Sequence, residues 1–369
     1  MASAGANGRP NCIDARITQL VTEVLRVDPA NPDKELIARA AACLRAGGLV
    51  AFPTETVYGL GAHALDRVAI LRVFAAKARP ANDPLIVHVA TLDEAVPLVE
   101  DLPRVARELA ARFWPGPLTM VLKRSTLVPD EVTAGLGTVA IRVPSHPVAR
   151  ALLEGARIPV AAPSANLFSR PSPTRAAHVV ADLNGRIDMI VDGGPTEVGL
   201  ESTVIDLSGA VPTILRPGAI DVDALRQVLP GVTSRQAAAS DTAAMPSPGM
   251  LAKHYSPKTP VVLYQGDRAT ALGLMTREAQ RRTASGETVV VLSYTEDVGE
   301  LRHLGARIVE LAAEASPAAV AARLYAAFRE CDELGAGVIL VRGITTRHPL
   351  TAAIQDRLRR AAVLTPDIQ

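Results

Sequence analysis

Aromatic residues and cysteines are both scarce in this chain, and each scarcity narrows what the protein can be. Aromatic residues make up 3% of the 369 residues, whereas apolar residues make up 48%. The hydrophobic core must therefore consist mainly of Ala, Val, Leu and Ile. The three cysteines, Cys12, Cys43 and Cys331, are far apart and form no C-x-x-C pair. This spacing excludes a zinc ribbon and a disulfide framework, and it is typical of a reducing compartment.

Strong charge and long apolar runs are missing as well. The formal net charge is +1 at pH 7, which argues against bulk, electrostatically driven binding of nucleic acid. No run approaches the ~18 apolar residues of a membrane span. The first ten residues lack the apolar centre of a signal peptide. We therefore predict a cytoplasmic protein without a membrane-bound part.

The chain length and the local patterns predict two domains. Residues 33–225 mix strands and helices without a strict βαβ rhythm, which indicates one mixed, twisted sheet flanked by helices. Residues 260–369 alternate more regularly and predict a smaller Rossmann-like α/β domain, without the G-x-G-x-x-G of a dinucleotide site. Residues 226–259 are predicted as a linker and residues 1–32 as an N-terminal tail, in which Val24 and Leu25 belong to an amphipathic turn or an added strand. The predicted fold class is therefore α/β.

The stretch from Ala51 to Gly61 carries the first sign of function. The apolar run 49–52 predicts a short buried strand that ends at Pro53. Two threonines, a carboxylate and a tyrosine follow, and Gly59 and Gly61 then predict a tight turn. Polar side chains at the end of a buried strand are where open α/β sheets place ligands. The alternative is an ordinary connection from strand to helix with incidental threonines.

Fixed cations and small hydrogen-bonding side chains recur beside strand ends and proline turns. The cations are Lys77, Arg79, Arg142 and Arg216, and the small polar residues are Ser164, Asn166, Ser172, Ser202 and Thr203. Arginines together with hydroxyls and backbone N–H groups suit a polyanion such as a nucleoside triphosphate. The chain has no Walker A sequence, so an ATP site would be of another design. The residues alone thus indicate an α/β protein with a basic, hydroxyl-rich cleft that binds phosphate.

Simpler explanations exist for each of these residues. His88, in an apolar strand, could be a core histidine bonded to backbone. Arg142 could be the exposed residue of an alternating strand. Lys77 and Arg79 could interact with a helix dipole, and the serines near prolines could form turns. The histidines are too dispersed for a recognisable zinc site, so we predict no metal-ligating residues.

Seven segments, taken together, resemble the YrdC-like threonylcarbamoyl-AMP synthases in order and spacing. They are Phe52–Leu60, Lys77–Pro80, Pro84–His88, Pro163–Asn166, Pro171–Thr174, Glu201–Val204 and Leu215–Gly218. The string from Pro248 to Pro257 and the C-terminal α/β unit resemble the long, two-domain form of this family. Each segment alone is a weak signal, but seven in order are specific.

The resemblance implies a reaction and a set of partners. The amine of L-threonine is carboxylated by bicarbonate, and the new carboxylate attacks the α-phosphate of ATP. Pyrophosphate leaves and threonylcarbamoyl-AMP remains, with Mg²⁺ as the cofactor on the phosphates. A partner complex then transfers the threonylcarbamoyl group to adenosine 37 of tRNA.

The resemblance also implies roles for individual residues. L-Threonine would be held by Thr56, His88, Arg142, the Ala162 backbone and Ser202, with Arg142 gripping the α-carboxylate through a bidentate pair. ATP would be held by Arg79, Asp83, Thr138, Ser164, Ser172 and Arg216, with Tyr255 of the linker closing over the nucleotide as a lid. Lys77 and Arg79 would be the catalytic residues, acting by positioning and charge neutralisation. Asp83 departs from the asparagine that is usual in the family, and it would repel a triphosphate unless Mg²⁺ intervenes.

Two other functions remain open. A concave basic face could bind double-stranded RNA or tRNA directly, without catalysis, although the low net charge and the lack of basic-aromatic interleaving argue against this. A carbamoyl-transfer enzyme of hydrogenase maturation shares the YrdC-like domain. Its cysteine-rich zinc segments are excluded here by the dispersed cysteines.

Overall fold

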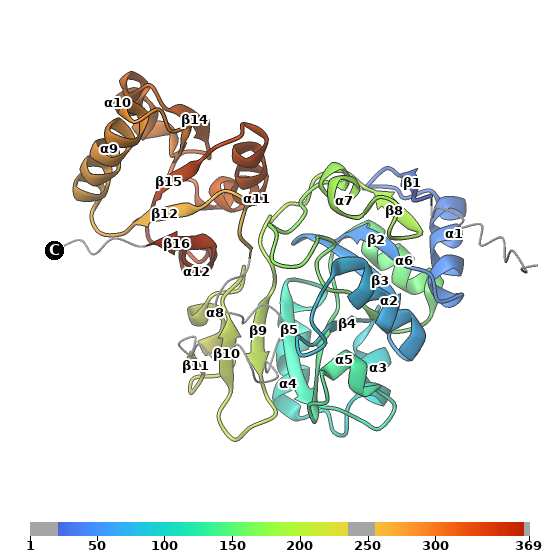
Figure 1. Cartoon of the computed structure of the whole chain (residues 1–369). Coiled ribbons are helices and arrows are strands. Elements are labelled where there is room, and N and C mark those ends of the chain that lie inside the picture. Colours follow the sequence, from blue (N-terminus) through green and yellow to red (C-terminus); the bar gives the residue numbers. More distant parts are fainter. Residues whose placement is uncertain (1–20, 235–254, 365–369) are drawn as a thin grey trace, which may run out of the picture.

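The chain forms two α/β domains in the computed structural model, which describes residues 21–234 and 255–364 (Figure 1). The first domain contains an 11-stranded sheet in the order β1-β8-β2-β3-β7-β4-β6-β5-β9-β10-β11, with parallel and antiparallel neighbours. The second contains a 5-stranded sheet in the order β14-β13-β15-β12-β16. The predicted fold class, a mixed sheet flanked by helices followed by a smaller Rossmann-like domain, is confirmed.

The elements of the first domain have the following bounds. Its strands are β1 (Glu23–Arg26), β2 (Val50–Pro53), β3 (Tyr58–His63), β4 (Ile86–His88), β5 (Leu118–Lys123), β6 (Thr138–Arg142), β7 (Val160–Ala161), β8 (Met189–Asp192), β9 (Thr203–Asp206), β10 (Thr213–Arg216) and β11 (Thr233–Ser234). Its helices are α1 (Lys34–Arg45), α2 (Arg67–Lys77), α3 (Leu92–Ala95), η1 (Val96–Leu98), α4 (Arg104–Phe113), α5 (Asp130–Thr133), α6 (Pro147–Ala156), α7 (Ala176–Leu183) and α8 (Val222–Arg226).

The elements of the second domain follow. Its strands are β12 (Val261–Tyr264), β13 (Val289–Ser293), β14 (Arg307–Glu310), β15 (Val338–Arg342) and β16 (Ala362–Leu364). Its helices are α9 (Arg268–Ala284), η2 (Thr295–Asp297), α10 (Val298–Leu301), η3 (Arg302–Leu304), α11 (Pro317–Glu333) and α12 (Thr351–Ala361).

Helix starts in the first domain follow from short polar side chains at the N-caps. The Asp33 carboxylate accepts the backbone N–H groups of Glu35 at 2.9 Å and Leu36 at 3.0 Å, where α1 begins. Asp66 caps α2 in the same way. Such caps satisfy donors that the first turn of a helix leaves unpaired. These side chains therefore fix where the helices that flank the site begin.

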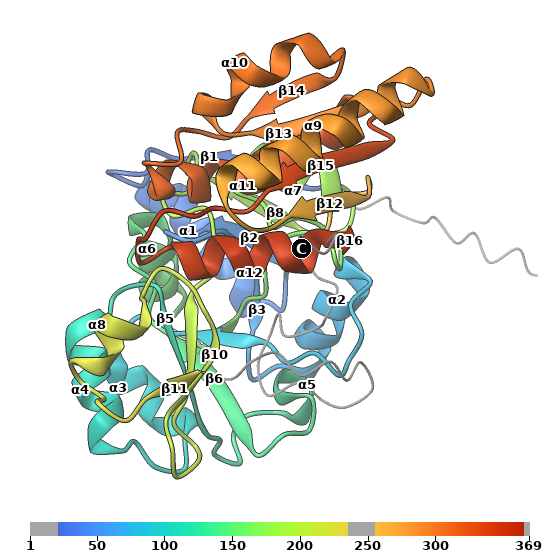
Figure 2. The ribbon, with the colours of Figure 1, turned by 90° about the vertical axis from the view of Figure 1, so that its left-hand side faces the viewer.

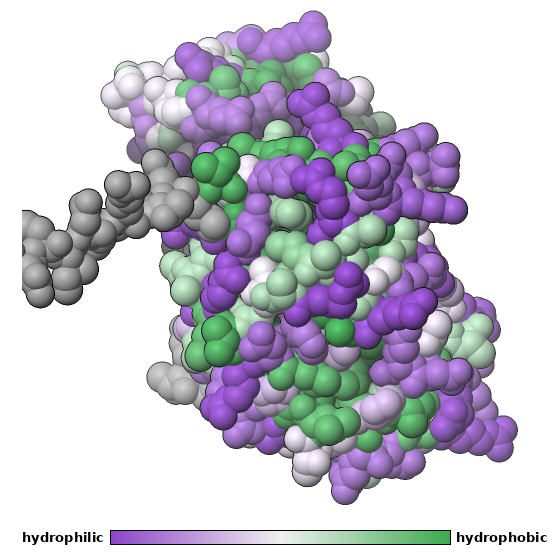
Figure 3. Space-filling model, turned by 90° about the vertical axis from the view of Figure 1, so that its right-hand side faces the viewer, coloured by the Kyte–Doolittle hydropathy of each residue, from purple (hydrophilic) through white to green (hydrophobic). Residues whose placement is uncertain are grey.

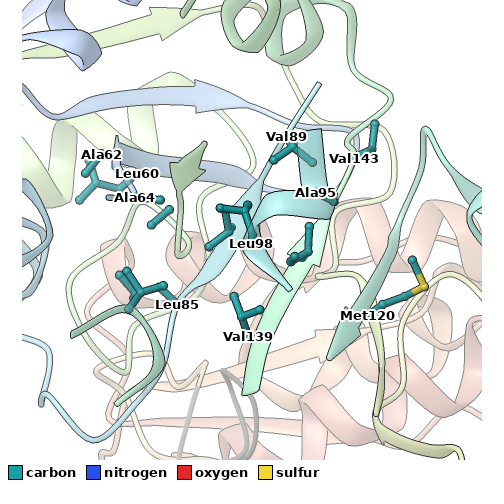
Figure 4. Packing of buried hydrophobic residues seen from close by; sticks show 14 of the residues in the cluster. Leu60, Ala62, Ala64, Leu85, Val89, Ala95, Leu98, Met120, Val139 and Val143 are labelled. Carbon is teal, nitrogen blue, oxygen red and sulfur yellow. The ribbon is translucent and has the colours of Figure 1, made fainter. Parts of the chain in front are cut away.

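The sheet of the first domain divides its buried side chains between two apolar layers. Successive strand residues point to opposite faces, so Val50 and Phe52 pack in the cluster that contains α1 and α6. Leu49 and Ala51 pack in the larger cluster on the other face. Figure 4 shows part of that larger cluster, in which apolar side chains from strands, such as Leu60, pack with others from the helical turns α3 and η1, such as Leu98. The core consists mainly of Ala, Val, Leu and Ile, as the composition predicts.

The tight turn predicted at Gly59 and Gly61 is wrong, because both residues lie in β3, which pairs antiparallel with β2. Close packing accounts for the second glycine. A Cβ atom on Gly61 would lie 2.8 Å from the Phe52 ring and 2.9 Å from a methyl group of Val160. The turn comes earlier, at residues 54–57, and this places the polar part of the stretch at the tip of a hairpin.

Two boundaries differ from those expected from the sequence. The predicted tail contains β1, which pairs in parallel with β8 from Glu23 to Arg26, so the added strand in this region is correct. The predicted linker contains β11 beside β10. Lys253 and His254 of the predicted lid lie outside the described residues, whereas Tyr255 lies within them.

The five strands of the second domain run parallel, with helices on both faces. Helix α9 packs on one face, and α11 and α12 pack on the other. The α11–α12 face is turned toward the first domain, and Figure 2 shows α12 lying between the two sheets. The apolar cluster on this face also includes Val57, Leu200 and Tyr255. The two domains thus share one buried apolar layer.

One face of the molecule carries both polar and apolar side chains. Figure 3 shows one face, on which hydrophilic side chains surround smaller apolar patches. Exposed apolar residues such as Val68 and Leu127 are ordinary on a protein surface. Within 21–234 and 255–364, no helix has the length and apolar character needed to cross a bilayer.

Candidate active site

A pocket lies where the β2–β3 hairpin tip meets the ends of β4, β6 and β10. It is lined by Thr54, Thr56, Val57, Gly59, Arg79, Ile86, His88, Arg142, Ala162, Pro163, Ser164, Glu201, Ser202, Arg216 and Tyr255. All five residues predicted to hold L-threonine lie in this lining. Of the residues predicted to hold ATP, Arg79, Ser164, Arg216 and Tyr255 do so. The fold therefore brings to one place side chains that the sequence separates by up to 199 positions, from Thr56 to Tyr255.

The hairpin tip is held rigid by its own hydroxyls. Thr54 donates its hydroxyl to the Val57 carbonyl at 2.7 Å. Its oxygen lies 2.7 Å from the Thr56 hydroxyl, which is the donor in that contact because the Thr54 proton is already used. The Thr56 oxygen in turn accepts from Arg142. This chain of hydrogen bonds fixes the orientation of both threonines in the pocket.

Arg142, the last residue of β6, is buried and does not form the exposed side of an alternating strand. Its guanidinium donates to Glu55 at 2.6 Å, to Thr56 at 2.9 Å and to the Gly116 carbonyl at 3.3 Å. Burial raises the pKa of Glu55, but the adjacent Arg142 outweighs burial and brings that pKa below its ordinary value. A guanidinium has five N–H donors, so Arg142 keeps two for a carboxylate ligand.

His88 is both a core histidine bonded to the backbone and a residue of the pocket lining. Its Nδ1 lies 3.2 Å from the Ile86 carbonyl, as in a core histidine, and its ring also lines the pocket. Burial, reinforced by the charge of Arg142, lowers the pKa of His88 to about 3. The ring is therefore neutral at physiological pH. With the Nδ1 proton donated to Ile86, Nε2 can accept a hydrogen bond from a ligand.

The opposite wall is built around Arg216 and Ser202. Arg216, at the end of β10, donates to the Ser202 carbonyl at 3.0 Å and to the Ser202 hydroxyl at 3.1 Å. That hydroxyl also lies 2.8 Å from Thr119. The N–H of Ala162 donates to Ile86 at 2.8 Å, so its backbone can offer a ligand only the carbonyl. These contacts leave a wall of one arginine and several hydroxyls.

Four predicted residues lie outside the pocket lining. Lys77 is buried, and its ammonium donates to the carbonyls of Ser164 at 2.5 Å and Asn166 at 2.6 Å. Burial and the nearby Arg79 lower its pKa well below the ordinary value. These hydrogen bonds show that Lys77 holds the 163–166 loop in place. Its role near the phosphates of ATP stays a prediction.

Asp83 and Thr138 also lie outside the lining. Asp83 forms a buried ion pair of 2.9 Å with Arg79, so its carboxylate orients an arginine of the pocket. Thr138 begins β6 and pairs with Lys123, about 13 Å of strand away from Arg142. Their roles toward ATP stay predictions.

Ser172 is fully buried, and its hydroxyl donates to Glu201 at 2.5 Å. Glu201 also accepts from Arg357 of α12 at 2.7 Å and from Tyr325 of α11 at 2.9 Å. Sequence reasoning gave no role to Glu55, Glu201, Tyr325 or Arg357. Glu55 directly precedes Thr56, and Glu201 directly precedes Ser202. Because buried arginines need counter-ions, these two positions could have been predicted from the sequence. The two α11–α12 residues carry no local signal.

Tyr255 closes the pocket from the side of the second domain. It is buried, with a positive φ of 64°. Arg216 donates to its hydroxyl at 3.4 Å. Its ring lies 5.7 Å from the Tyr325 ring, and the Arg357 guanidinium lies 5.0 Å from its centroid. Tyr255 is thus held between the two domains.

Known proteins resemble this chain along most of its length. It is 42% identical to threonylcarbamoyl-AMP synthase of Pyrococcus abyssi, over 88% of this chain and 93% of the relative. The chain belongs to the threonylcarbamoyl-AMP synthase family. The Bacillus subtilis member is 41% identical, over 91% of this chain and 95% of its own.

Domain-level comparisons agree with this assignment. A family model described as "Telomere recombination" matches residues 42–218, and the model of the "Threonylcarbamoyl-AMP synthase, C-terminal domain" matches residues 220–363. The crystal structure of P. abyssi Sua5 complexed with L-threonine superposes with a TM-score of 0.86 at 39% identity, over 94% of this chain and all of that one. The resemblance seen in seven short segments is confirmed, and it extends over both domains of the threonylcarbamoyl-AMP synthase fold.

Proposed function

We propose that this protein makes threonylcarbamoyl-AMP from L-threonine, bicarbonate and ATP and releases pyrophosphate. The observation that carries the proposal is the pocket between Arg142 and Arg216. One wall offers two guanidinium donors beside Thr56, and the other offers Arg216 beside Ser202. Such a site suits a carboxylate on one side and a phosphate on the other. Family membership and the L-threonine complex of P. abyssi Sua5 support the same substrates.

The chemistry balances with groups that the pocket can supply by position alone. The threonine nitrogen attacks bicarbonate, and water leaves to give an N-carboxylate. An oxygen of that carboxylate then attacks the α-phosphorus of ATP, and the bond to pyrophosphate breaks. Arg142 would hold the α-carboxylate, while Arg79 and Arg216 would neutralise charge on the α-phosphate. No covalent enzyme intermediate is required, so positioning and electrostatics supply the rate.

Magnesium would enter this site with ATP. Among the described residues, no group of three or more His, Cys, Asp or Glu side chains is arranged to hold a metal ion. The acidic residues at and around the pocket are already paired with arginines: Glu201 with Arg357, Glu55 with Arg142 and Asp83 with Arg79. The phosphates would therefore be the main ligands of Mg²⁺, and the ion would supply charge neutralisation there.

The product defines what must come next. A carbamoyl-adenylate is a reactive mixed anhydride, so a group-transfer step has to follow. We propose that a tRNA-modifying complex consumes it, which makes this reaction the first step toward N6-threonylcarbamoyladenosine at position 37 of tRNA. The cytoplasmic location stays a prediction, as do bicarbonate and the downstream complex.

The test is pyrophosphate release from ATP by the purified full-length chain, with and without L-threonine and bicarbonate. We expect release to require both, with L-serine much less effective. The matched variants are Arg142→Lys, in the pocket, and Arg104→Ala, whose side chain is 92% exposed on α4. Arg104→Ala should behave as the parent protein. Release that ignores L-threonine would contradict the proposal and favour the RNA-binding alternative, which salt-dependent binding of tRNA would then test.

A further inference from the structure

Glu201 lines the pocket on the side of Arg216, and its carboxylate joins the two domains there. One of its oxygens accepts from Ser172 at 2.5 Å. The other accepts from Tyr325 at 2.9 Å and Arg357 at 2.7 Å, which belong to α11 and α12 of the second domain. Burial raises the pKa of Glu201, but Arg357 and then Arg216 outweigh it, so the carboxylate stays ionised.

Arg357 reaches three parts of the same wall. Besides Glu201, it donates to the Pro217 carbonyl at 3.2 Å, directly after Arg216. Its guanidinium also lies 5.0 Å from the centre of the Tyr255 ring, within range of a cation–π interaction. The side chain is fully buried, although a free arginine would favour water. Arg357 also donates to Asp356 of its own helix. Its other three contacts are with residues of the pocket wall or their direct neighbours.

Other contacts already hold the two domains together. Arg329 of α11 pairs with Asp182 of α7 at 2.7 Å. Val57, Leu200 and Tyr255 pack in the apolar cluster of α11 and α12. Arg357 is therefore one of several contacts between the domains, and its contacts with the first domain lie at the pocket wall.

We propose that Arg357 and Tyr325 of the C-terminal domain are positioning residues for the nucleotide. They act through Glu201, which orients Ser172, and through Tyr255, which they hold over the pocket. The guanidinium of Arg142, on the threonine side, makes no such contact itself, because its hydrogen-bond partners are Glu55, Thr56 and Gly116 of its own domain. This inference rests on the proposed ATP-dependent reaction and assigns the second domain a specific part in it.

The test is steady-state pyrophosphate release by full-length Arg357→Met and Tyr325→Phe. We expect Arg357→Met to raise the KM for ATP about tenfold or more, as loss of a buried charged contact does, with the KM for L-threonine within about twofold. Tyr325→Phe removes one hydroxyl and should raise the KM for ATP a few-fold. Arg359→Ala is the matched control, since Arg359 lies exposed on the same helix, and it should leave both constants unchanged.

A second arm separates positioning from simple stability. Arg357→Met leaves the buried Glu201 carboxylate without its main partner, so the variant will melt at a lower temperature. Adding Glu201→Gln removes that charge and should restore most of the melting temperature, because Asp356, the other carboxylate paired with Arg357, keeps Arg360 as a partner. Positioning requires the KM for ATP to stay high in this double variant. Recovery of both properties, or equal changes in both KM values for Arg357→Met, would overturn the inference.

Failure of the proposed function would look different. In that case the unsubstituted protein itself would show no threonine-dependent pyrophosphate release. An active parent protein with an unchanged KM for ATP in Arg357→Met would refute the positioning role alone.

Discussion

Two buried arginine–glutamate pairs border the same pocket, but they are built from different parts of the chain. Arg142 and Glu55 lie 2.6 Å apart, and both belong to the first domain. Arg357 and Glu201 lie 2.7 Å apart and join the second domain to the first. In both pairs burial raises the pKa of the glutamate, and the paired arginine, together with neighbouring hydrogen-bond donors and, for Glu201, Arg216, brings that pKa below its ordinary value. The two pairs are therefore similar in charge and burial, but one lies within a domain and the other joins two domains.

This difference divides the pocket into two halves, one around Arg142 and one around Arg216, whose arginines are held in place by different residues. The Arg142 half is anchored by neighbouring strands and a hairpin tip of one sheet. The Arg216 half depends on a wall whose rear contacts come from α11 and α12. Changes in the second domain should therefore affect the nucleotide more than threonine. Removing Arg142 should do the reverse.

The largest expected effect is that of Arg142→Ala. The substitution removes the two donors available to a carboxylate and leaves Glu55 buried without its partner. We expect kcat/KM for L-threonine to fall by about a hundredfold or more, while the KM for ATP changes little. The measurement is pyrophosphate release at varied concentrations of each substrate. Equal losses for both substrates would remove the distinction between the two halves.

Folding of this variant needs its own control. Loss of one partner of a buried pair costs about 3–5 kcal/mol, so thermal unfolding must be followed in parallel. Arg142→Met combined with Glu55→Gln removes both charges and should recover most of that stability. Threonine-dependent activity should not return, because the carboxylate donors remain absent.

A smaller effect is expected for Gly199→Ala, which tests the support from α11. Gly199 has a φ of +74°, and a Cβ atom there would lie 2.4 Å from the Cα of Ala322 in α11. Backbone bonds to Glu55 and Thr56 hold its loop on the other side, so α11 must shift. We expect a loss of about 1–3 kcal/mol in unfolding free energy, measured by chemical denaturation.

Gly194→Ala supplies the comparison for that variant. Gly194 has a similar φ of +81°, but nothing lies within 4 Å of its Cβ position. The two variants share the backbone strain of a positive φ, and only Gly199→Ala adds the clash with α11. Equal melting temperatures would mean that α11 adapts without cost, contrary to the expected coupling.

Local chemistry made much of the first domain predictable. Asp33 precedes an apolar helical pattern, and Thr91 with Glu94 has the spacing of a capping box. In the structure Asp33 caps α1 and Thr91 caps α3. The residues expected around threonine gather in one pocket because strand ends meet at one edge of the sheet. These features depend on near neighbours or on the general geometry of sheets.

The remaining features depend on contacts between distant residues. The local sequence predicts a turn at Gly61, whereas in the structure its missing side chain leaves room for Phe52 on the neighbouring strand β2. The contact between Glu201 and Arg357 joins positions 156 residues apart, and nothing in the local sequence around Arg357 indicates it. A position in α12 becomes part of the pocket wall only when the second domain docks.

The smallest expected effect concerns His88, which lies next to the Arg142 pair. Its pKa is lowered to about 3 from an ordinary value near 6.5, by burial and then by Arg142. Between those values the unfolded chain binds a proton that the folded chain does not, so this contribution to stability is fully present above pH 6.5 and is lost as the pH falls toward 3. His88→Gln should therefore flatten the fall in melting temperature between pH 6.5 and 4.5. Exposed His303→Gln should keep the parent slope. An unchanged slope in His88→Gln would mean that the ring titrates in the folded protein as it does in the unfolded chain, which would contradict the lowered pKa.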